Sequence, residues 1–548
     1  MNPHESFSFD SLSRRDLLRV GATGLLAASA GGVLAACGGS TGSSGAGTHN
    51  TAFSSGPAAS GTPVKGGALK VGLVSNGASE TIDVRLLVAT NDYARSDQLY
   101  DPLFFLAPNT VSRSGYSPGL AVSGEPNADA TVWTLRLRRD VEWHDGKSFT
   151  ADDVIYTINS SWFSPKSGWL PVAKALIDRS RVRKLDAHTV VIPLKRGLAG
   201  FPLVLAWFNA YVVQDGTDFR RAVGTGPFKF EAFTPGVQST FVANPNYWGG
   251  APHIDRLIIN SSFTDHAARL NALLSGEIHI APEIPTALAK ANQGSGHLVL
   301  GNAAGPAFAT LLMRINQPPF TDMRVRQAFK MLTDRAAFVE SVWDGFATVG
   351  NDCVGHTFPY FADDLKSVYD PERARSLLKA AGHEGLTVSL LTSPAEPGIN
   401  ETATLWAAQA KAAGVNVKVK SLPTATYFTS TYPGYTTDAR PFSMTYWDII
   451  GSLPTFYIEA LISGAEFNET AWGSPQHDAL INDALAETDP ARAADKWHAV
   501  QEVQHTQGGY LIPANYNYVD GYAPNVRGVE SSNIGPNSNF AYYKAWLT

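Results

Sequence analysis

The sequence predicts an α/β protein built from two or three lobes. At 548 residues the chain is too long for one hydrophobic core. Within 132–160, apolar and polar residues first alternate as in a half-buried strand, a glycine then marks a turn, and apolar residues at helical spacing follow. Residues 386–419 are predicted to form a strand, a helix and a second strand. That order favours a mostly parallel sheet in this part of the chain.

The stretch 132–160 gives the most detailed prediction of local structure. Apolar and polar residues alternate along 132–137, as on a strand with one buried face. Gly146 supplies the positive φ that a tight turn needs. Thr150 and Asp153 have the spacing of a capping box, so a helix is expected to begin directly after Thr150.

Charge and composition narrow the class of function. The net charge is −6, so no basic surface favours nucleic acid. The chain is rich in Trp, Tyr and Phe, which suits a large core or a protein that encloses a ligand. Of the two cysteines, Cys353 is expected to be a lone buried thiol. The histidines are scattered and no His/Cys cluster occurs, so neither a metal site nor a cofactor is predicted.

The N-terminus is predicted to be an export signal. Arg14 and Arg15 match a twin-arginine signal, and the weakly apolar segment after them is short for a spanning helix. Cys37 follows Leu-Ala-Ala, which resembles a lipobox and implies a diacylglycerol on the thiol. An uncleaved anchor is the alternative. Residues 1–36 are therefore expected to be a signal peptide, and 37–65, rich in Gly, Ser, Thr and Ala, a flexible tether outside the membrane.

Several motifs in order resemble one family. The most specific is VEWHDGKSFTADDV at 141–154, and four others are YDPL at 100–103, GTGPF at 224–228, SGEIHIA at 275–281 and PFTDMRVRQA at 319–328. Together they are similar to the ABC-transporter solute-binding proteins of the oligopeptide, dipeptide and nickel class (extracellular solute-binding protein family 5). The resemblance covers residues 66–529.

The resemblance implies a fold and a domain order. It implies an α/β periplasmic-binding-protein type II fold, with two lobes, a hinge and an extra inserted lobe. Lobe I would comprise 66–109, 224–310 and 525–548, the inserted lobe 110–223, and the ligand-closing lobe II 311–524. Binding of a solute would favour the closed form, because only that form contacts the solute from both sides.

The resemblance also implies site residues. Asp448 matches the family's acid that takes the ligand's α-ammonium, although Trp447 directly precedes it and five residues separate it from Pro454. Trp447 and Tyr446 would add apolar contact. A carboxylate that ends an apolar run is costly unless it is paired, and an ammonium would supply that pair. A cap on the following turn is the other interpretation of Asp448.

Two further pairs are candidates for the ligand cleft. Thr90 and Asn91 fall where the family's chain skirts the cleft, and a solvated loop is the alternative interpretation. Tyr516 and Tyr518 lie on the predicted return strand, where alternating tyrosines also suit a half-buried strand.

The resemblance implies a monomeric, lipid-anchored receptor outside the cytoplasmic membrane. It would capture short peptides, or a similar amino-bearing solute, and deliver them to the permease and ATPase of an ABC importer. No catalytic residue is predicted. One alternative is a receptor of the same fold for a glycan, an opine or a metal chelate such as nickel. Another is an exported hydrolase, which needs a nucleophile, a base and an orienting group that the sequence does not offer together.

Overall fold

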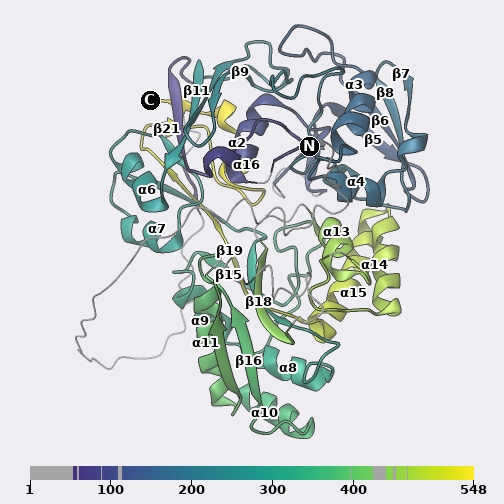
Figure 1. The fold of residues 1–548 in the computed structure, drawn as a ribbon, viewed down its shortest axis with the longest axis vertical. Helices are drawn as coiled ribbons and strands as arrows, with labels where there is room; N and C mark the ends of the chain where they lie inside the picture. Colours follow the sequence, from purple (N-terminus) through teal and green to yellow (C-terminus); the bar gives the residue numbers. More distant parts are fainter. Residues whose placement is uncertain are drawn as a thin grey trace, which may run out of the picture.

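The computed structural model describes most of the chain. The described residues are 54–57, 61–87, 89–108, 114–394, 396–423, 427, 440–447, 452–465 and 467–548. Figure 1 shows three bodies: one at the upper left, a second beside it at the upper right, and a third below them. We call these the first lobe, the inserted lobe and the second lobe.

The first lobe is built on an eight-stranded sheet. The strand order is β1 (Ser54–Ser55), β13 (Val299–Ala303), β20 (Tyr518–Tyr522), β12 (Ile280–Ala281), β2 (Ala68–Val74), β11 (Arg256–Phe263), β10 (Gln238–Ala243) and β9 (Phe228–Thr234). Its helices are η1 (Gly77–Ser79), α2 (Thr90–Leu99), α6 (His266–Leu274) and α7 (Thr286–Asn292). The last part of the chain returns here as β21 (Val526–Arg527), α16 (Asn537–Phe540), η5 (Tyr542–Lys544) and β22 (Trp546–Leu547).

The inserted lobe carries a four-stranded antiparallel sheet. Its order is β5 (Ala121–Pro126), β6 (Val132–Leu137), β8 (Thr189–Pro193) and β7 (Arg183–Asp186). A short hairpin, β3 (Phe104–Leu106) with β4 (Tyr116–Pro118), joins it to the first lobe. The helices are α3 (Ala151–Tyr156), which continues as the π-helical η2 (Thr157–Trp162), then α4 (Leu170–Leu176), η3 (Arg179–Arg181) and α5 (Phe201–Val204).

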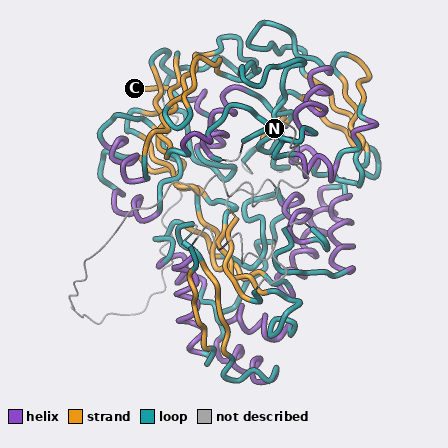
Figure 2. Tube along the Cα trace, viewed as in Figure 1, coloured by secondary structure: helices purple, strands orange, loops and turns teal. Residues whose placement is uncertain are grey.

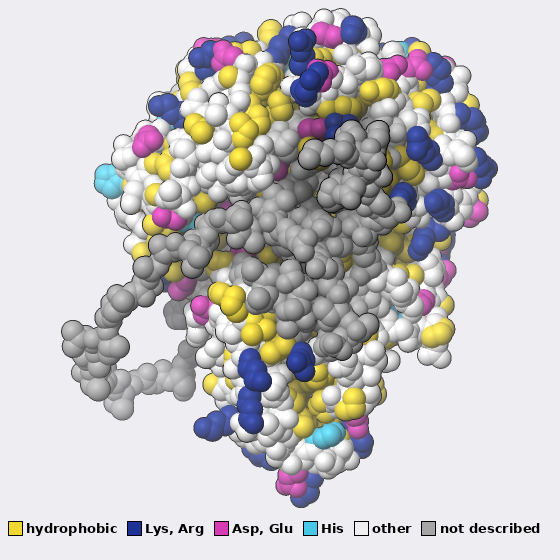
Figure 3. Space-filling model, viewed as in Figure 1, with side chains coloured by type: hydrophobic (Ala, Val, Ile, Leu, Met, Phe, Trp, Pro, Cys, Tyr) yellow, Lys and Arg dark blue, Asp and Glu magenta, His cyan; other side chains and the backbone are white. Residues whose placement is uncertain are grey.

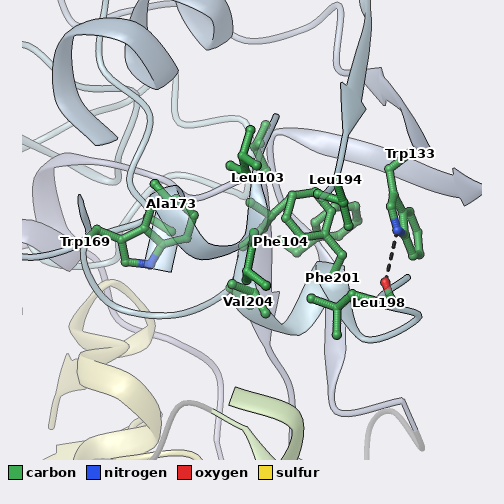
Figure 4. Close-up of a cluster of buried hydrophobic side chains, with 14 of the residues drawn as sticks. Leu103, Phe104, Trp133, Trp169, Ala173, Leu194, Leu198, Phe201 and Val204 are labelled. Atoms are coloured by element: carbon green, nitrogen blue, oxygen red, sulfur yellow. Dashed lines mark hydrogen bonds between the residues drawn. The ribbon is translucent and has the colours of Figure 1, made fainter. Parts of the chain in front are cut away.

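The predicted strand–turn–helix at 132–160 is confirmed. Trp133, Leu135 and Leu137 of β6 are buried. The capping box is also present: the backbone N–H of Asp152 donates to Thr150 Oγ1 at 3.3 Å, and the N–H of Thr150 donates to Asp153 Oδ2 at 2.8 Å. Figure 4 shows the core beneath β6, where the Trp133 indole donates to the Leu198 carbonyl at 3.1 Å.

Two of the sequence motifs meet through His144. The backbone N–H of Gly224 donates to His144 Nδ1 at 3.1 Å, so the proton lies on Nε2, which donates to the Gly226 carbonyl at 3.0 Å. Burial lowers the pKa of His144 to about 4, with the Lys229 charge in the same direction. The imidazole therefore stays neutral and ties the HDG turn to the GTGPF segment.

The second lobe contains a six-stranded sheet between two layers of helices. Its order is β15 (Ala347–Val349), β19 (Tyr510–Tyr516), β14 (Phe308–Met313), β18 (Phe442–Trp447), β16 (Thr387–Thr392) and β17 (Asn416–Ser421). One layer is α8 (Met323–Met331), α9 (Arg335–Ser341), α10 (Pro371–Ala380) and α11 (Ile399–Ala412). The other is α13 (Leu453–Phe456), η4 (Tyr457–Leu461), α14 (Pro475–Ala486) and α15 (Pro490–Gln507).

The expectation of a mostly parallel sheet in this lobe is wrong. Only β16 pairs in parallel, with β17 and with β18. The pairs β14–β18, β14–β19 and β15–β19 are antiparallel. The local strand–helix–strand order correctly predicts the β16–β17 edge. It carries no information about β14, which enters this sheet from the first lobe, or about β19, which leads back to that lobe.

The chain crosses between the first and second lobes at two adjacent places. β13 leads to β14 through residues 304–307, and β19 leads to β20 through Asn517 alone. The Asn517 amide donates to Asn302 Oδ1 at 2.7 Å, so the two crossings are bonded to each other. β20 pairs in the first sheet from Tyr518 onward, a few residues before 524, the limit expected for lobe II. The lobe limits themselves stay a prediction.

The inserted lobe rests on the second helix layer of the second lobe. The backbone N–H of Ala199 donates to the Leu485 carbonyl of α14 at 2.7 Å. In Figure 2 the helices of this layer lie directly below the inserted lobe. On the face shown in Figure 3, acidic and basic side chains are interspersed.

Candidate functional site

A small aromatic pocket lies where the lobes meet. Residues from the first lobe, from the hairpin next to the inserted lobe, and from the second lobe all line it. They are Thr90, Tyr93, Leu106, Trp207, Phe208, Glu283, Phe358, Tyr518, Ile534, Gly535, Pro536 and Phe540. The cavity measures about 20 Å³. Ligand pockets usually measure roughly 300–1,000 Å³, so a solute can enter only if the surrounding parts move apart.

Two of the predicted site residues line this pocket. Thr90 is the first residue of α2, and Tyr518 is the first residue of β20. They lie far apart in the sequence. Tyr93, one turn after Thr90, stacks on Phe208 with 4.5 Å between the ring centroids and continues the aromatic lining.

Asn91 does not line the pocket and is hydrogen-bonded within the first lobe. Its side chain is 4% exposed, and the amide donates to the Val74 carbonyl and to Glu80 Oε1, both at 2.8 Å. Glu80 in turn pairs with the fully buried Arg95. Burial alone would raise the pKa of Glu80, but the Arg95 charge and hydrogen bonds from Asn76 and Asn91 hold it below its usual value. This network fixes the residues that lead into α2.

The remaining aromatic candidates pack within the second lobe. Tyr516 stacks on Trp343 with 4.5 Å between centroids. Tyr446 packs against the cluster beneath α8–α11. Trp447 is 7% exposed, meets Phe456 edge to face, and donates from its indole to Glu469 Oε2 at 3.3 Å.

Four predicted residues lie outside the described residues. They are Asp448, directly after the end of β18, and the signal-segment residues Arg14, Arg15 and Cys37. Cys353, the other cysteine, is buried and free, and burial raises the pKa of its thiol.

Glu283 is a pocket residue that sequence reasoning missed. Its backbone has φ +54°, a left-handed conformation that is uncommon for a non-glycine residue. The conformation is held because the Glu283 N–H donates to Asp520 Oδ1 at 3.1 Å and its carbonyl accepts from Arg269 at 2.8 Å. Burial lowers the pKa of Arg269 to about 10, against the opposing charges of Glu283 and Asp520. No motif in the sequence marks this position.

A strained turn forms another wall of the pocket. Residues Asn537, Ser538, Asn539 and Phe540 of α16 all have φ between +48° and +59°. Each such residue costs of the order of 1–3 kcal/mol, so the surroundings must hold the turn in place. Asp520 does this, because its carboxylate accepts from Ser531 Oγ at 2.5 Å and from the Asn537 N–H at 2.8 Å.

The described residues offer neither a metal-binding cluster nor a helix that could cross a membrane. They contain no group of three or more His, Cys, Asp and Glu side chains that could hold a metal ion. Within the same residues, no helix combines the length and the apolar character needed to cross a membrane.

The chain matches a family of binding proteins. The family model "Bacterial extracellular solute-binding proteins, family 5 Middle" matches residues 115–468. The dipeptide-binding protein of Escherichia coli (strain K12) is 26% identical over 506 residues, which are 84% of this chain and 92% of that protein. Heme-binding protein A of Haemophilus influenzae is 26% identical over 489 residues, 82% and 87% of the two chains.

Solved structures show the same fold. HbpA2 from Haemophilus parasuis has a TM-score of 0.76 at 21% identity and covers 88% of this chain and 100% of its own. MoaA bound to mannopinic acid has a TM-score of 0.67 at 24% identity and covers 88% and 99%. The predicted periplasmic-binding α/β fold is therefore confirmed. Because the family model covers well over half of the sequence, the chain belongs to the bacterial extracellular solute-binding proteins of family 5.

Proposed function

We propose that this protein is a lipid-anchored extracytoplasmic receptor that captures short peptides, or a similar amino-bearing solute, for an ABC importer. The observation that carries the proposal is the aromatic pocket at the meeting of the lobes, with Glu283 among its lining residues. Aromatic faces and a carboxylate both attract an ammonium group. Lobe I, the inserted lobe and lobe II, with the limits given above, would close around such a solute.

Family membership supports capture rather than chemistry, because the family consists of solute-binding proteins. The E. coli relative is a dipeptide-binding protein, which favours a peptide. Other relatives are a heme-binding protein and a receptor bound to mannopinic acid, so a non-peptide solute of the opine, glycan or metal-chelate kind is the second candidate.

Asp448 is proposed as the acid that receives the solute's α-ammonium. A charge-assisted hydrogen bond contributes roughly 1.5–3 kcal/mol, so Asp448→Asn should weaken peptide binding by about 10- to 100-fold. Calorimetry on a free dipeptide and on its N-acetylated form would test this. The wild type should prefer the free amine, and Asp448→Asn should lose that preference.

An unchanged dissociation constant in Asp448→Asn would dismiss the ammonium role. Mass spectrometry of the solute that co-purifies with the protein would decide between a peptide and the second candidate. Release of amino acids from the dipeptide during the same measurement would instead indicate a hydrolase.

Export and anchoring are proposed from Arg14, Arg15 and Cys37. The receptor would leave the cytoplasm by the twin-arginine route and remain on the outer face of the membrane as a monomer. Cys37→Ala should move the protein from the membrane fraction to the soluble extracytoplasmic fraction. Replacement of both Arg14 and Arg15 by Lys should retain it in the cytoplasm. A membrane-bound Cys37→Ala variant would contradict the lipid anchor.

A further inference from the structure

Four side chains form a row across the end of the second-lobe sheet. Trp447 pairs with Phe308, Phe308 pairs with Asn515, and Asn515 pairs with Thr348. Directly paired residues of antiparallel strands lie on the same face of a sheet, so these four side chains share one face. In Figure 1, β15, β18 and β19 reach up toward the first lobe. β18 ends at Trp447, directly before Asp448.

Phe308 and Trp447 pack against an aromatic neighbour, whereas the polar atoms of Asn515 and Thr348 have no hydrogen-bond partner among the described residues. Phe456 of α13 packs on Phe308, at 6.0 Å between centroids, and on Trp447, at 4.5 Å. Asn515 is 0% exposed, yet neither Oδ1 nor Nδ2 forms a hydrogen bond with any residue that the structure describes. The Thr348 hydroxyl beside it is buried and likewise lacks a partner among those residues.

An arrangement of this kind is costly for the free protein. A buried polar group without a partner costs about 1–3 kcal/mol, and most such groups in native proteins are bonded. Asn351, in the same lobe, shows the ordinary case: its amide donates to the carbonyls of Ala362 at 2.9 Å and Leu365 at 3.1 Å. A leucine at 515 would fill a similar volume without the cost. Asn515 therefore reduces stability unless a partner arrives.

We propose that Asn515, assisted by Thr348, hydrogen-bonds a backbone amide of the bound solute. A primary amide offers one acceptor and two donors, which complement the N–H and C=O of a peptide group. The Thr348 hydroxyl adds a donor for the same carbonyl. Asn515 is fully buried in the present arrangement, so the contact requires another arrangement in which the solute reaches the side chain, as when the lobes are apart. This inference rests on the proposed function and adds to it a requirement for an amide.

The test compares an amide with an ester. Alanyl-phenylalanine and alanyl-phenyllactate differ only in that the ester lacks the peptide N–H. The wild type should bind the amide about tenfold or more tightly than the ester, since the ester leaves a buried acceptor unmet. Asn515→Leu should bind both with the same reduced affinity, while its melting temperature stays equal to or above that of the wild type.

Matched variants separate recognition from stability. Asn351→Leu removes a bonded amide, so it should lower the melting temperature and keep the amide preference. Thr348→Val should weaken amide binding severalfold at an unchanged melting temperature, and it decides the matter if Asn515→Leu does not fold. If Asn515→Leu retains the full amide preference, or if Thr348→Val binds the amide as tightly as the wild type, the assignment is overturned. A lower melting temperature of Asn515→Leu with unchanged affinity would show an amide bonded within the protein and would also overturn it.

Failure of the proposed function gives a different result. In that case the wild type binds neither the amide nor the ester, and the assignment of Asn515 falls with the peptide proposal.

Discussion

Asn91 and Asn515 are buried to nearly the same degree but have opposite environments. Asn91, 4% exposed at the start of α2, has both protons of its amide in hydrogen bonds within the first lobe. Asn515, 0% exposed at the end of β19, has no bonded partner within the described residues. Burial alone therefore does not show whether a polar side chain is structural. In our proposal the Asn91 amide holds the first lobe together, whereas the Asn515 amide is kept for the solute.

The largest effect is expected from breaking the ion pair behind Asn91. Arg95→Met leaves the Glu80 carboxylate buried without its charge partner, which typically costs 3–5 kcal/mol. Urea unfolding would measure the change in the free energy of unfolding. A loss below about 1 kcal/mol would mean that the buried pair contributes no more than an exposed ion pair. The contrast between Asn91 and Asn515 would then lose its support in the first lobe.

A smaller effect is expected at Asn91 itself. Asn91→Leu deprives the Val74 carbonyl and Glu80 Oε1 of a donor, so a loss of about 2–3 kcal/mol is expected. The matched Asn515→Leu variant should lose none. Equal losses in the two variants, measured by the same urea unfolding, would remove the contrast between the two asparagines.

The smallest effect is the acid response of His144, another fully bonded group. Its folded-state pKa of about 4 lies below the unfolded value near 6.5. The unfolded chain thus binds more protons between these values, and the stabilisation present above pH 6.5 is lost as the pH falls toward 4. Unfolding at pH 7 and pH 4.5 should show a loss of about 2 kcal/mol that His144→Gln lacks. An identical pH profile in the variant would contradict this.

Much of the fold can be predicted from local pattern. The alternation at 132–137 and the capping box at Thr150 both depend on residues close in sequence, and the structure confirms them. The antiparallel pairing of β14 with β18 and β19 could not be predicted, because it depends on where the chain crosses between lobes. Sequence spacing does not determine that.

The candidate site likewise contains residues that the sequence predicts and residues that it does not. The places of Thr90 and Tyr518 in the chain predict them as site residues, and both line the pocket. Asn91 is adjacent to Thr90, but only the folded position of Glu80 decides which way its amide is used. Glu283 and Asn515 carry no motif. One is defined by a backbone angle and the other by the absence of a described partner, and neither property can be read from residue type.

The adjoining crossings have a mechanical consequence. We expect the one-residue link at Asn517, hydrogen-bonded to Asn302, to act as a hinge that lets the lobes rotate but resists their sliding past each other. Rotation about a hinge displaces atoms far from it more than atoms close to it. The contact between Ala199 of the inserted lobe and Leu485 of α14 should therefore separate farther than the pocket walls next to Tyr518, although those walls must also part before a solute can enter.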